Sequence, residues 1–156
     1  MHTASYFIEK LSLQPHVEGG YYKEIYRSAL TTGDRSLSTS IYFLLKEDQL
    51  SRFHQLTADE IWFFHQGATL IVHCIDSEGR LSQLRLGMDL DAGEQPQLLI
   101  PAGTIFASEV SDKTSFALVS CIVSPGFEFD DFKLFSKEEL IEKYPQHKEI
   151  AERLGV

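Results

Sequence analysis

Short strand-like runs, repeated along most of the chain, constrain the fold of this sequence more than any other feature. The runs are rich in Ile, Val, Phe, Tyr and Thr, and turn-forming groups such as Thr32-Gly33-Asp34 and Ser77-Glu78-Gly79 separate them. Many short strands without intervening helices are typical of an all-β sandwich or barrel. We therefore predict a mainly β fold. The predicted strands span residues 21–27, 38–45, 51–56, 60–65, 68–75, 80–86, 97–101, 104–110, 115–124 and 131–135.

Helical patterns are confined to the two ends of the chain. At the start, Thr3 can cap a helix whose apolar side chains fall on one stripe. That stripe consists of Ala4, Phe7, Ile8 and Leu11. Near the end, Ser136 and Glu139 form a capping-box pattern, and Pro145 interrupts the helix that follows. We predict short N-terminal and C-terminal helices flanking a single domain that spans residues 1–156.

Length and charge limit the classes of function. A chain of 156 residues can bury roughly two thirds of its unfolded surface, so it needs no disulfide or structural metal to fold. Its 14 basic and 23 acidic residues give a net charge of -9, which repels polyanions such as nucleic acids. Neither a signal pattern nor an apolar run of about 20 residues is present. We expect a cytoplasmic protein that binds neither nucleic acid nor a membrane.

The two cysteines are predicted to be buried thiols. Cys74 and Cys121 lie on separate predicted strands, without the close spacing of a zinc site or a redox pair. His73 precedes Cys74, but neighbours on a strand point to opposite faces, which argues against a catalytic dyad.

His54 and Glu60 are the ionisable residues that strand alternation places together. If His54 points into the interior, Leu56 does too, and beyond the turn Glu60 and Trp62 share that inward face. His65 has the opposite parity and is expected to point away. A carboxylate among aromatic residues is expensive to bury without a partner or a task. We therefore predict that His54 and Glu60 meet in an aromatic-walled cavity.

Nine motifs spread over nearly the whole chain carry a family resemblance. They include Pro15-His16-Val17-Glu18-Gly19-Gly20-Tyr21-Tyr22, and together they occupy residues 15–22, 26–28, 38–45, 53–54, 59–62, 96–97, 101–103, 124–129 and 131–132. With these motifs the chain resembles the fifth cupin family (Cupin_5), a small single-domain group with no firmly assigned activity. The resemblance implies a jelly-roll barrel, or double-stranded β-helix, paired as a homodimer and distantly similar to dTDP-sugar epimerase-like cupins.

The cupin pattern has four metal-ligand positions, and two of them are apolar in this chain. Counted from His54, the second histidine falls on Leu56 and the glutamate on Glu60, while the last histidine, after Pro101-Ala102-Gly103, falls on Phe106. Leu and Phe side chains cannot bind a cation. The pattern therefore predicts no complete metal site. A divalent metal is the alternative, with His54 and Glu60 as its ligands.

A pocket for a small polar ligand is predicted around His54 and Glu60, because pockets of this kind combine apolar walls with a few convergent polar groups. Phe106 would enter it from the side opposite Glu60, since it occupies the last ligand position. The other predicted lining residues are Tyr21, Lys23, Tyr42 and Trp62.

Three functions are compatible with such a site. In the first, a metal-independent epimerase or isomerase acts on a sugar or another small polar substrate, with His54 as general base and Glu60 as acid or orienting group. In the second, the chain binds or senses a small ligand without turnover. In the third, a metal-dependent oxygenase or isomerase completes its ligand set with water and one further side chain.

Overall fold

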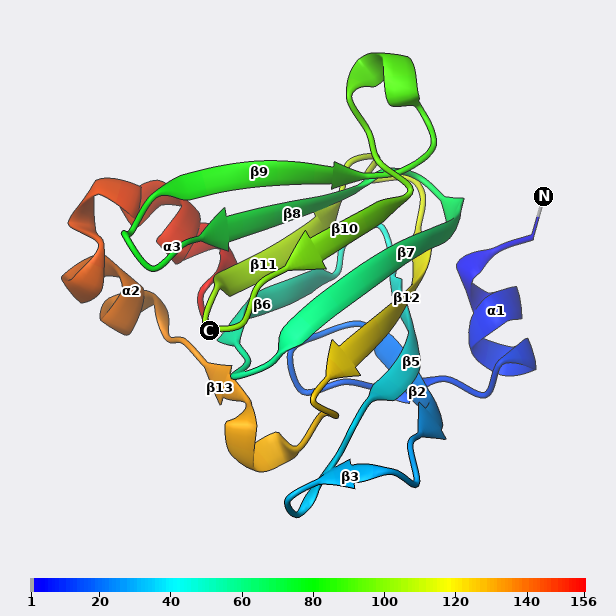
Figure 1. The fold of residues 1–156 in the computed structure, drawn as a ribbon. Coiled ribbons are helices and arrows are strands. Elements are labelled where there is room, and N and C mark those ends of the chain that lie inside the picture. The colour runs from blue at the N-terminus through cyan, green and yellow to red at the C-terminus, as the bar shows by residue number, and fades with distance from the viewer. Residues whose placement is uncertain (1) are drawn as a thin grey trace.

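Two antiparallel sheets packed face to face form the body of the computed structural model, which describes residues 2–156 (Figure 1). The six-stranded sheet contains, in spatial order, β1 (Gln14–Pro15), β2 (Tyr21–Arg27), β5 (Thr39–Leu45), β12 (Ala117–Ser124), β7 (Asp59–Gly67) and β10 (Gln97–Ile100). The five-stranded sheet contains β13 (Lys133–Leu134), β6 (Leu50–Gln55), β11 (Ile105–Val110), β8 (Leu70–Ile75) and β9 (Leu81–Leu86). A small hairpin, β3 (Thr31–Thr32) and β4 (Arg35–Ser36), projects at the bottom of Figure 1.

The predicted mainly β fold is confirmed. Each of the ten predicted runs overlaps one of the strands β2 and β5 to β13. The two-residue strands β1, β3 and β4 were not predicted, because strands this short leave no alternation pattern in the sequence.

The main core lies between the two sheets. Phe43, Trp62 and Val119 point inward from the six-stranded sheet and meet Val72 and Phe106 of the five-stranded sheet. Each of these side chains is at most 2% exposed. Burying a large apolar side chain contributes roughly 1.5–3 kcal/mol relative to leaving it in water. This layer therefore holds the sheets together.

Helix α1 (Ala4–Lys10) covers part of the outer face of the six-stranded sheet. Thr3 caps it, because its hydroxyl oxygen accepts a hydrogen bond from the Tyr6 N–H at 3.3 Å. The predicted apolar stripe of this helix packs against Leu44 and Leu118. Both side chains have the parity opposite to the core residues on their strands.

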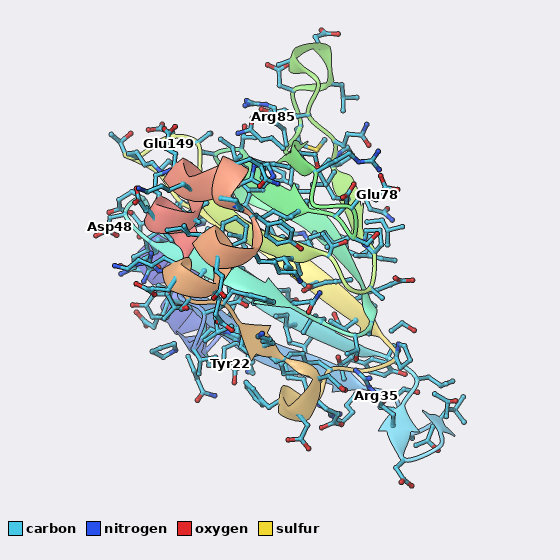
Figure 2. The ribbon with its side chains drawn as sticks, turned by 90° about the vertical axis from the view of Figure 1, so that its left-hand side faces the viewer. Tyr22, Arg35, Asp48, Glu78, Arg85 and Glu149 are labelled. Carbon is cyan, nitrogen blue, oxygen red and sulfur yellow. The ribbon has the colours of Figure 1, made fainter. Side chains whose placement is uncertain are left out.

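The C-terminal segment covers the outer face of the five-stranded sheet. Helix α2 (Lys137–Lys143) starts at the predicted capping box of Ser136 and Glu139, and the 3₁₀ turn η3 (Pro145–His147) leads into helix α3 (Lys148–Leu154). Figure 2 shows both helices lying over the sheet, with Glu149 at the exposed surface of α3. Leu140 and Leu154 pack on β6 and β11. Within residues 2–156, no helix is long and apolar enough to cross a bilayer.

The turn between β1 and β2 depends on two consecutive glycines. The φ angle is +108° at Gly19 and +78° at Gly20, in a region that side chains rarely adopt. A Cβ atom on Gly19 would overlap the carbonyl oxygen of Leu50. The turn therefore packs its bare backbone on β6, and the Arg52 N–H donates to the Glu18 carbonyl oxygen at 2.8 Å. This contact brings the residue before the glycines to the start of β6.

Candidate functional site

A pocket of about 170 Å³ opens into the interior between β2, β5, β6, β7 and β12 and the segment 127–132. Two histidines and two glutamates lie in its buried part: His16, His54, Glu18 and Glu60. Three charged side chains, which are roughly half exposed, form its mouth: Glu24, Arg27 and Glu128.

His54 is held between two hydrogen-bond acceptors. Its side chain is 3% exposed, its Nδ1 lies 2.7 Å from the Arg52 carbonyl oxygen, and its Nε2 lies 3.0 Å from Glu18 Oε2. A carbonyl oxygen can only accept, so Nδ1 carries a proton, and the Glu18 carboxylate accepts from Nε2. Burial opposes a charge on His54, but the Glu18 carboxylate outweighs burial and raises the pKa of His54. His54 and Glu18 thus form a buried imidazolium–carboxylate pair.

Glu18 was not predicted as a site residue, although it belongs to the first of the motifs quoted above. Burial alone would raise the pKa of this carboxyl, but the charge and hydrogen bond of His54 lower it below its usual value. The available signal was the Gly19-Gly20 pair, because adjacent glycines allow a backbone to approach another segment closely. That signal does not reveal which segment is approached.

Glu60 lies in the same pocket, close to the Trp62 and Cys121 side chains, and one of its carboxyl oxygens has no partner among the described residues. Its side chain is buried on β7, and no described residue gives its Oε2 a hydrogen bond. Burial raises the pKa of Glu60 to about 7, although the His54 charge opposes this. Burial likewise raises the pKa of the neighbouring Cys121 thiol well above its usual value. Glu60 therefore exchanges a proton near neutral pH, whereas Cys121 stays protonated.

His16 adds a second, uncharged histidine. Its Nδ1 accepts the Glu18 backbone N–H at 3.1 Å, so the neutral ring carries its proton on Nε2. Burial lowers the pKa of His16, and the nearby Glu18 carboxylate only partly offsets this. His16 was not predicted as a site residue, because it lies in a turn and has no strand parity.

Three phenylalanines from the segment after β12 form one side of the pocket, here called the aromatic wall: Phe127, Phe129 and Phe132. Their ring centroids lie 4.9 to 6.3 Å apart in edge-to-face contacts. Phe132 also lies 5.3 Å from the His54 ring, and the short helix η2 (Phe129–Asp131) presents Phe129 with 54% of its surface exposed. The three phenylalanines were not predicted as site residues, because the segment that carries them follows no regular period.

Arg27 joins the aromatic wall to β2 at the mouth. Its guanidinium donates to Glu128 Oε1 and to Glu24 Oε1, each at 2.8 Å, and to the Phe127 carbonyl oxygen at 3.0 Å. The two carboxylates outnumber the one guanidinium, so the mouth carries a net negative charge.

The structure brings His54, Leu56 and Glu60 together in the pocket, as strand parity predicts. On β2 and β5 the structure places three predicted lining residues outside the pocket: Tyr21, Lys23 and Tyr42. Tyr22 pairs across the sheet with the core residue Phe43, and cross-strand partners share a face. Tyr22 and Glu24 therefore face the pocket in their place.

Trp62 and Phe106 also do not line the pocket, contrary to prediction; they lie in the main core. Phe106 packs against the His54 ring at 4.1 Å and lies 6.1 Å from the Trp62 ring. Phe106 therefore supports the His54 ring from the core side. His65 points away on the opposite face, as predicted, and bonds to the Ser120 hydroxyl.

The chain is similar to known proteins both in sequence and in structure. Residues 5–135 match the family described as Cupin_5, Cupin superfamily (DUF985). The uncharacterised protein YML079W of Saccharomyces cerevisiae is 30% identical over 151 residues, which cover 85% of this chain and 75% of that protein.

Solved structures show the same architecture over the full chain. Protein SO0799 of Shewanella oneidensis is 50% identical with a TM-score of 0.96, and the alignment covers 100% of this chain and 99% of that one. A hypothetical protein from Leishmania major is 36% identical with a TM-score of 0.92 and 99% coverage of both chains. Oxalate decarboxylase from Bacillus subtilis is similar in fold alone, at 17% identity and a TM-score of 0.60 over 90% of this chain and 36% of that one.

The two packed sheets with a pocket between them define a cupin. Because the family match extends over most of the chain, the chain belongs to the Cupin_5 (DUF985) family of the cupin superfamily. The predicted family resemblance is confirmed.

The donor set of this pocket does not fit the cupin metal site. Leu56 and Phe106 occupy two ligand positions, and both nitrogens of His54 are engaged by protein acceptors. Within residues 2–156, no group of three or more His, Cys, Asp or Glu side chains is placed to hold a metal ion. A first-row metal needs several such donors around one point.

Proposed function

We propose that this chain binds a small polar molecule in the pocket and exchanges protons with it, as an isomerase or epimerase does. The observation that carries the proposal is the Glu60 carboxyl, which is 5% exposed, has no partner for Oε2, and lines a pocket. A buried carboxyl without a partner is costly, and strongly perturbed pKa values gather at functional sites. A pKa of about 7 suits a group that both takes and returns a proton.

The contacts of His54 change the roles expected from the sequence. Its two ring nitrogens already carry protons and donate to Arg52 and Glu18, so the ring has no lone pair free to accept another. The role of general base therefore passes to Glu60. His54 and Glu18 remain as a fixed ion pair beside it.

His16 is suited to the complementary role. Its neutral ring holds a proton on Nε2, which can donate a hydrogen bond to a substrate oxygen. In the proposed step, the Glu60 carboxylate removes a proton from a carbon next to a carbonyl group. The electron pair of the C–H bond passes to the carbonyl oxygen beside His16, and Glu60 then returns the proton to a carbon of the resulting enolate.

A non-catalytic binder is the second candidate. It is favoured by Leu56 and Phe106, because apolar residues at the cupin ligand positions suit a pocket that holds a ligand without transforming it. A ligand of this kind would stabilise the fold by mass action without any product.

Hydrogen exchange in heavy water tests the proposal. Proton NMR would follow the loss of C–H signals from a panel of hydroxy-aldehydes, hydroxy-ketones and sugars incubated with the protein. We expect exchange with at least one compound, slowed by a factor of about 100 or more in Glu60→Gln. Glu142→Gln, on the exposed side of α2, is the matched control. Undiminished exchange in Glu60→Gln contradicts the role of Glu60, and ligand-induced stabilisation without exchange favours the binder.

We also propose that the chain forms a homodimer through the outer face of the six-stranded sheet. Beyond the area covered by α1, this face carries partly exposed apolar side chains, including Ile61, Phe63 and Ile122, and Leu99 is 55% exposed. A partly exposed apolar patch of this kind is typical of a subunit contact. Light scattering should show twice the mass of one chain, and Phe63→Lys should shift it to the monomer. A wild-type monomer at micromolar concentration defeats this proposal.

A further inference from the structure

The pocket carries more negative than positive charge. Its lining holds the carboxylates of Glu18, Glu24, Glu60 and Glu128, against the cationic groups of Arg27 and His54. His54 neutralises Glu18, and Arg27 neutralises one of the two mouth carboxylates. One carboxylate at the mouth and Glu60 in the interior therefore remain without a counter-charge.

The aromatic wall is a second and independent feature. The faces of aromatic rings attract cations, and several rings around one site recognise alkylammonium groups. Phe129 is 54% exposed although it lines the pocket, so part of its surface is available to a bound molecule. The wall and the buried Glu60 line the same cavity, which gives a cation both a π surface and a counter-charge.

We propose that the ligand of this pocket is a small organic cation whose charged nitrogen lies against the aromatic wall. The proposal rests on the proposed function, because it names the substrate class of the same site. The Glu60 carboxylate, whose Oε2 has no partner among the described residues, attracts the cation across the cavity and remains free to take a proton from the ligand. The polar remainder of the ligand can then meet His16.

An anionic ligand suits this lining poorly. It would face the two uncompensated carboxylates, and Arg27 is already engaged by three acceptors at 2.8 to 3.0 Å. A phosphate or carboxylate would have to displace Glu24 or Glu128 to reach the guanidinium. Nucleotide sugars, which carry a diphosphate, are therefore disfavoured relative to amines.

Calorimetric titration with three molecules of similar shape isolates the effect of charge. The probes are choline, 3,3-dimethylbutan-1-ol, in which carbon replaces the charged nitrogen, and the anion 3,3-dimethylbutanoate. At about pH 8, where Glu60 is mostly ionised, choline should bind at least about tenfold more tightly than the alcohol. The carboxylate should bind most weakly.

Two variants test whether Glu60 and Phe129 cause the preference for choline over the alcohol. Glu60→Gln removes the interior charge with little change of shape, and Phe129→Ala removes a ring that is already half exposed. Each should reduce the preference for choline over the alcohol to about threefold or less. Glu142→Gln removes one charge from exposed α2 and should leave the preference unchanged.

The outcomes separate this proposal from the proposed function. If the alcohol or the carboxylate binds as tightly as choline or more tightly, the proposal of a cationic ligand is wrong, but the proposal that the pocket binds a small molecule is unaffected. Failure of choline to bind also overturns the proposal of a cationic ligand. If C–H exchange in heavy water is absent as well, and no compound stabilises the fold, the proposed function fails together with it.

Discussion

Two buried glutamates, on opposite sheets, are equally hidden from water and differ in what surrounds them. Glu109 is 7% exposed on β11, beneath α3, and accepts hydrogen bonds from His73 and Lys113, each at 2.9 Å, and from Arg153. Glu60 is 5% exposed in the pocket, and its Oε2 has no partner among the described residues. Burial tends to raise both pKa values. The bonds from Arg153, Lys113 and His73 outweigh it and lower the pKa of Glu109 to about 2, whereas that of Glu60 rises to about 7.

The comparison shows that burial alone does not identify a functional carboxylate. Glu109 fastens the C-terminal helix to the five-stranded sheet, and its full set of donors keeps it charged. Glu60 has no donor for Oε2 among the described residues, and it keeps the ability to change charge near neutral pH. The missing partner is therefore the feature that distinguishes a reactive group from a structural one.

The greatest loss of stability is expected when the ion pair beside Glu60 is broken. His54→Ala leaves the Glu18 carboxylate buried without its counter-charge, and breaking a buried pair in this way costs about 3–5 kcal/mol. Urea denaturation at neutral pH measures the loss. His2→Ala, at an exposed position ahead of α1, is the control and should change stability by less than about 1 kcal/mol. A loss of similar size in both variants would mean that the pair is not a buried ion pair.

A second prediction concerns the pH dependence of stability. The pKa of Glu60 rises from 4.5 to about 7 on folding, so this group binds more protons in the folded state, and its contribution to the stability of the wild type falls as pH rises from about 5 to 8. Glu60→Gln removes this term. Between those two pH values the unfolding free energy of Glu60→Gln should rise by about 2–3 kcal/mol relative to wild type, whatever constant cost the amide adds at both. Thermal and urea unfolding at both pH values give the difference, and a pH-independent difference contradicts the raised pKa.

Glu109→Gln should show the opposite sign and a smaller size. The pKa of Glu109 is lower in the folded state, so its contribution is present above about pH 5 and lost as pH falls toward 2. Because Arg153 and Lys113 are roughly half exposed, solvent screening limits the contribution to about 1–2 kcal/mol. Unfolding at about pH 7 and pH 3 should show the variant approaching wild type in acid. Proton exchange by the pocket should be unchanged.

The sequence predicts the sheets and half of the buried site for a physical reason. His54 and Glu60 occupy two ligand positions of the cupin pattern, which identifies the inward face of β6 and β7, and strand alternation then places Leu56 and Trp62 on the same face. On β2 the pairs Tyr21-Tyr22 and Lys23-Glu24 are alike on both faces. The alternation pattern there does not distinguish the two faces, so Tyr21 and Lys23 were predicted to line the pocket, whereas Tyr22 and Glu24 do.

The remaining site residues depend on long-range contacts that no local pattern records. Glu18 meets His54 because a turn packs on a strand that starts some thirty residues later. Phe129 reaches the pocket from an irregular segment, where side-chain direction follows no period. The missing partner of Glu60 is a property of the whole fold, and it became visible only when its neighbours were placed.

Gly19 limits which substitutions this pocket can tolerate. Its bare backbone rests on the Leu50 carbonyl, and it sets how far Glu18 stands from His54 while touching no ligand. A methyl group at this position would misalign the pair from outside the cavity. A redesign for a new ligand can therefore change the aromatic wall, whereas position 19 must remain glycine so that the distance between the turn and β6 is kept.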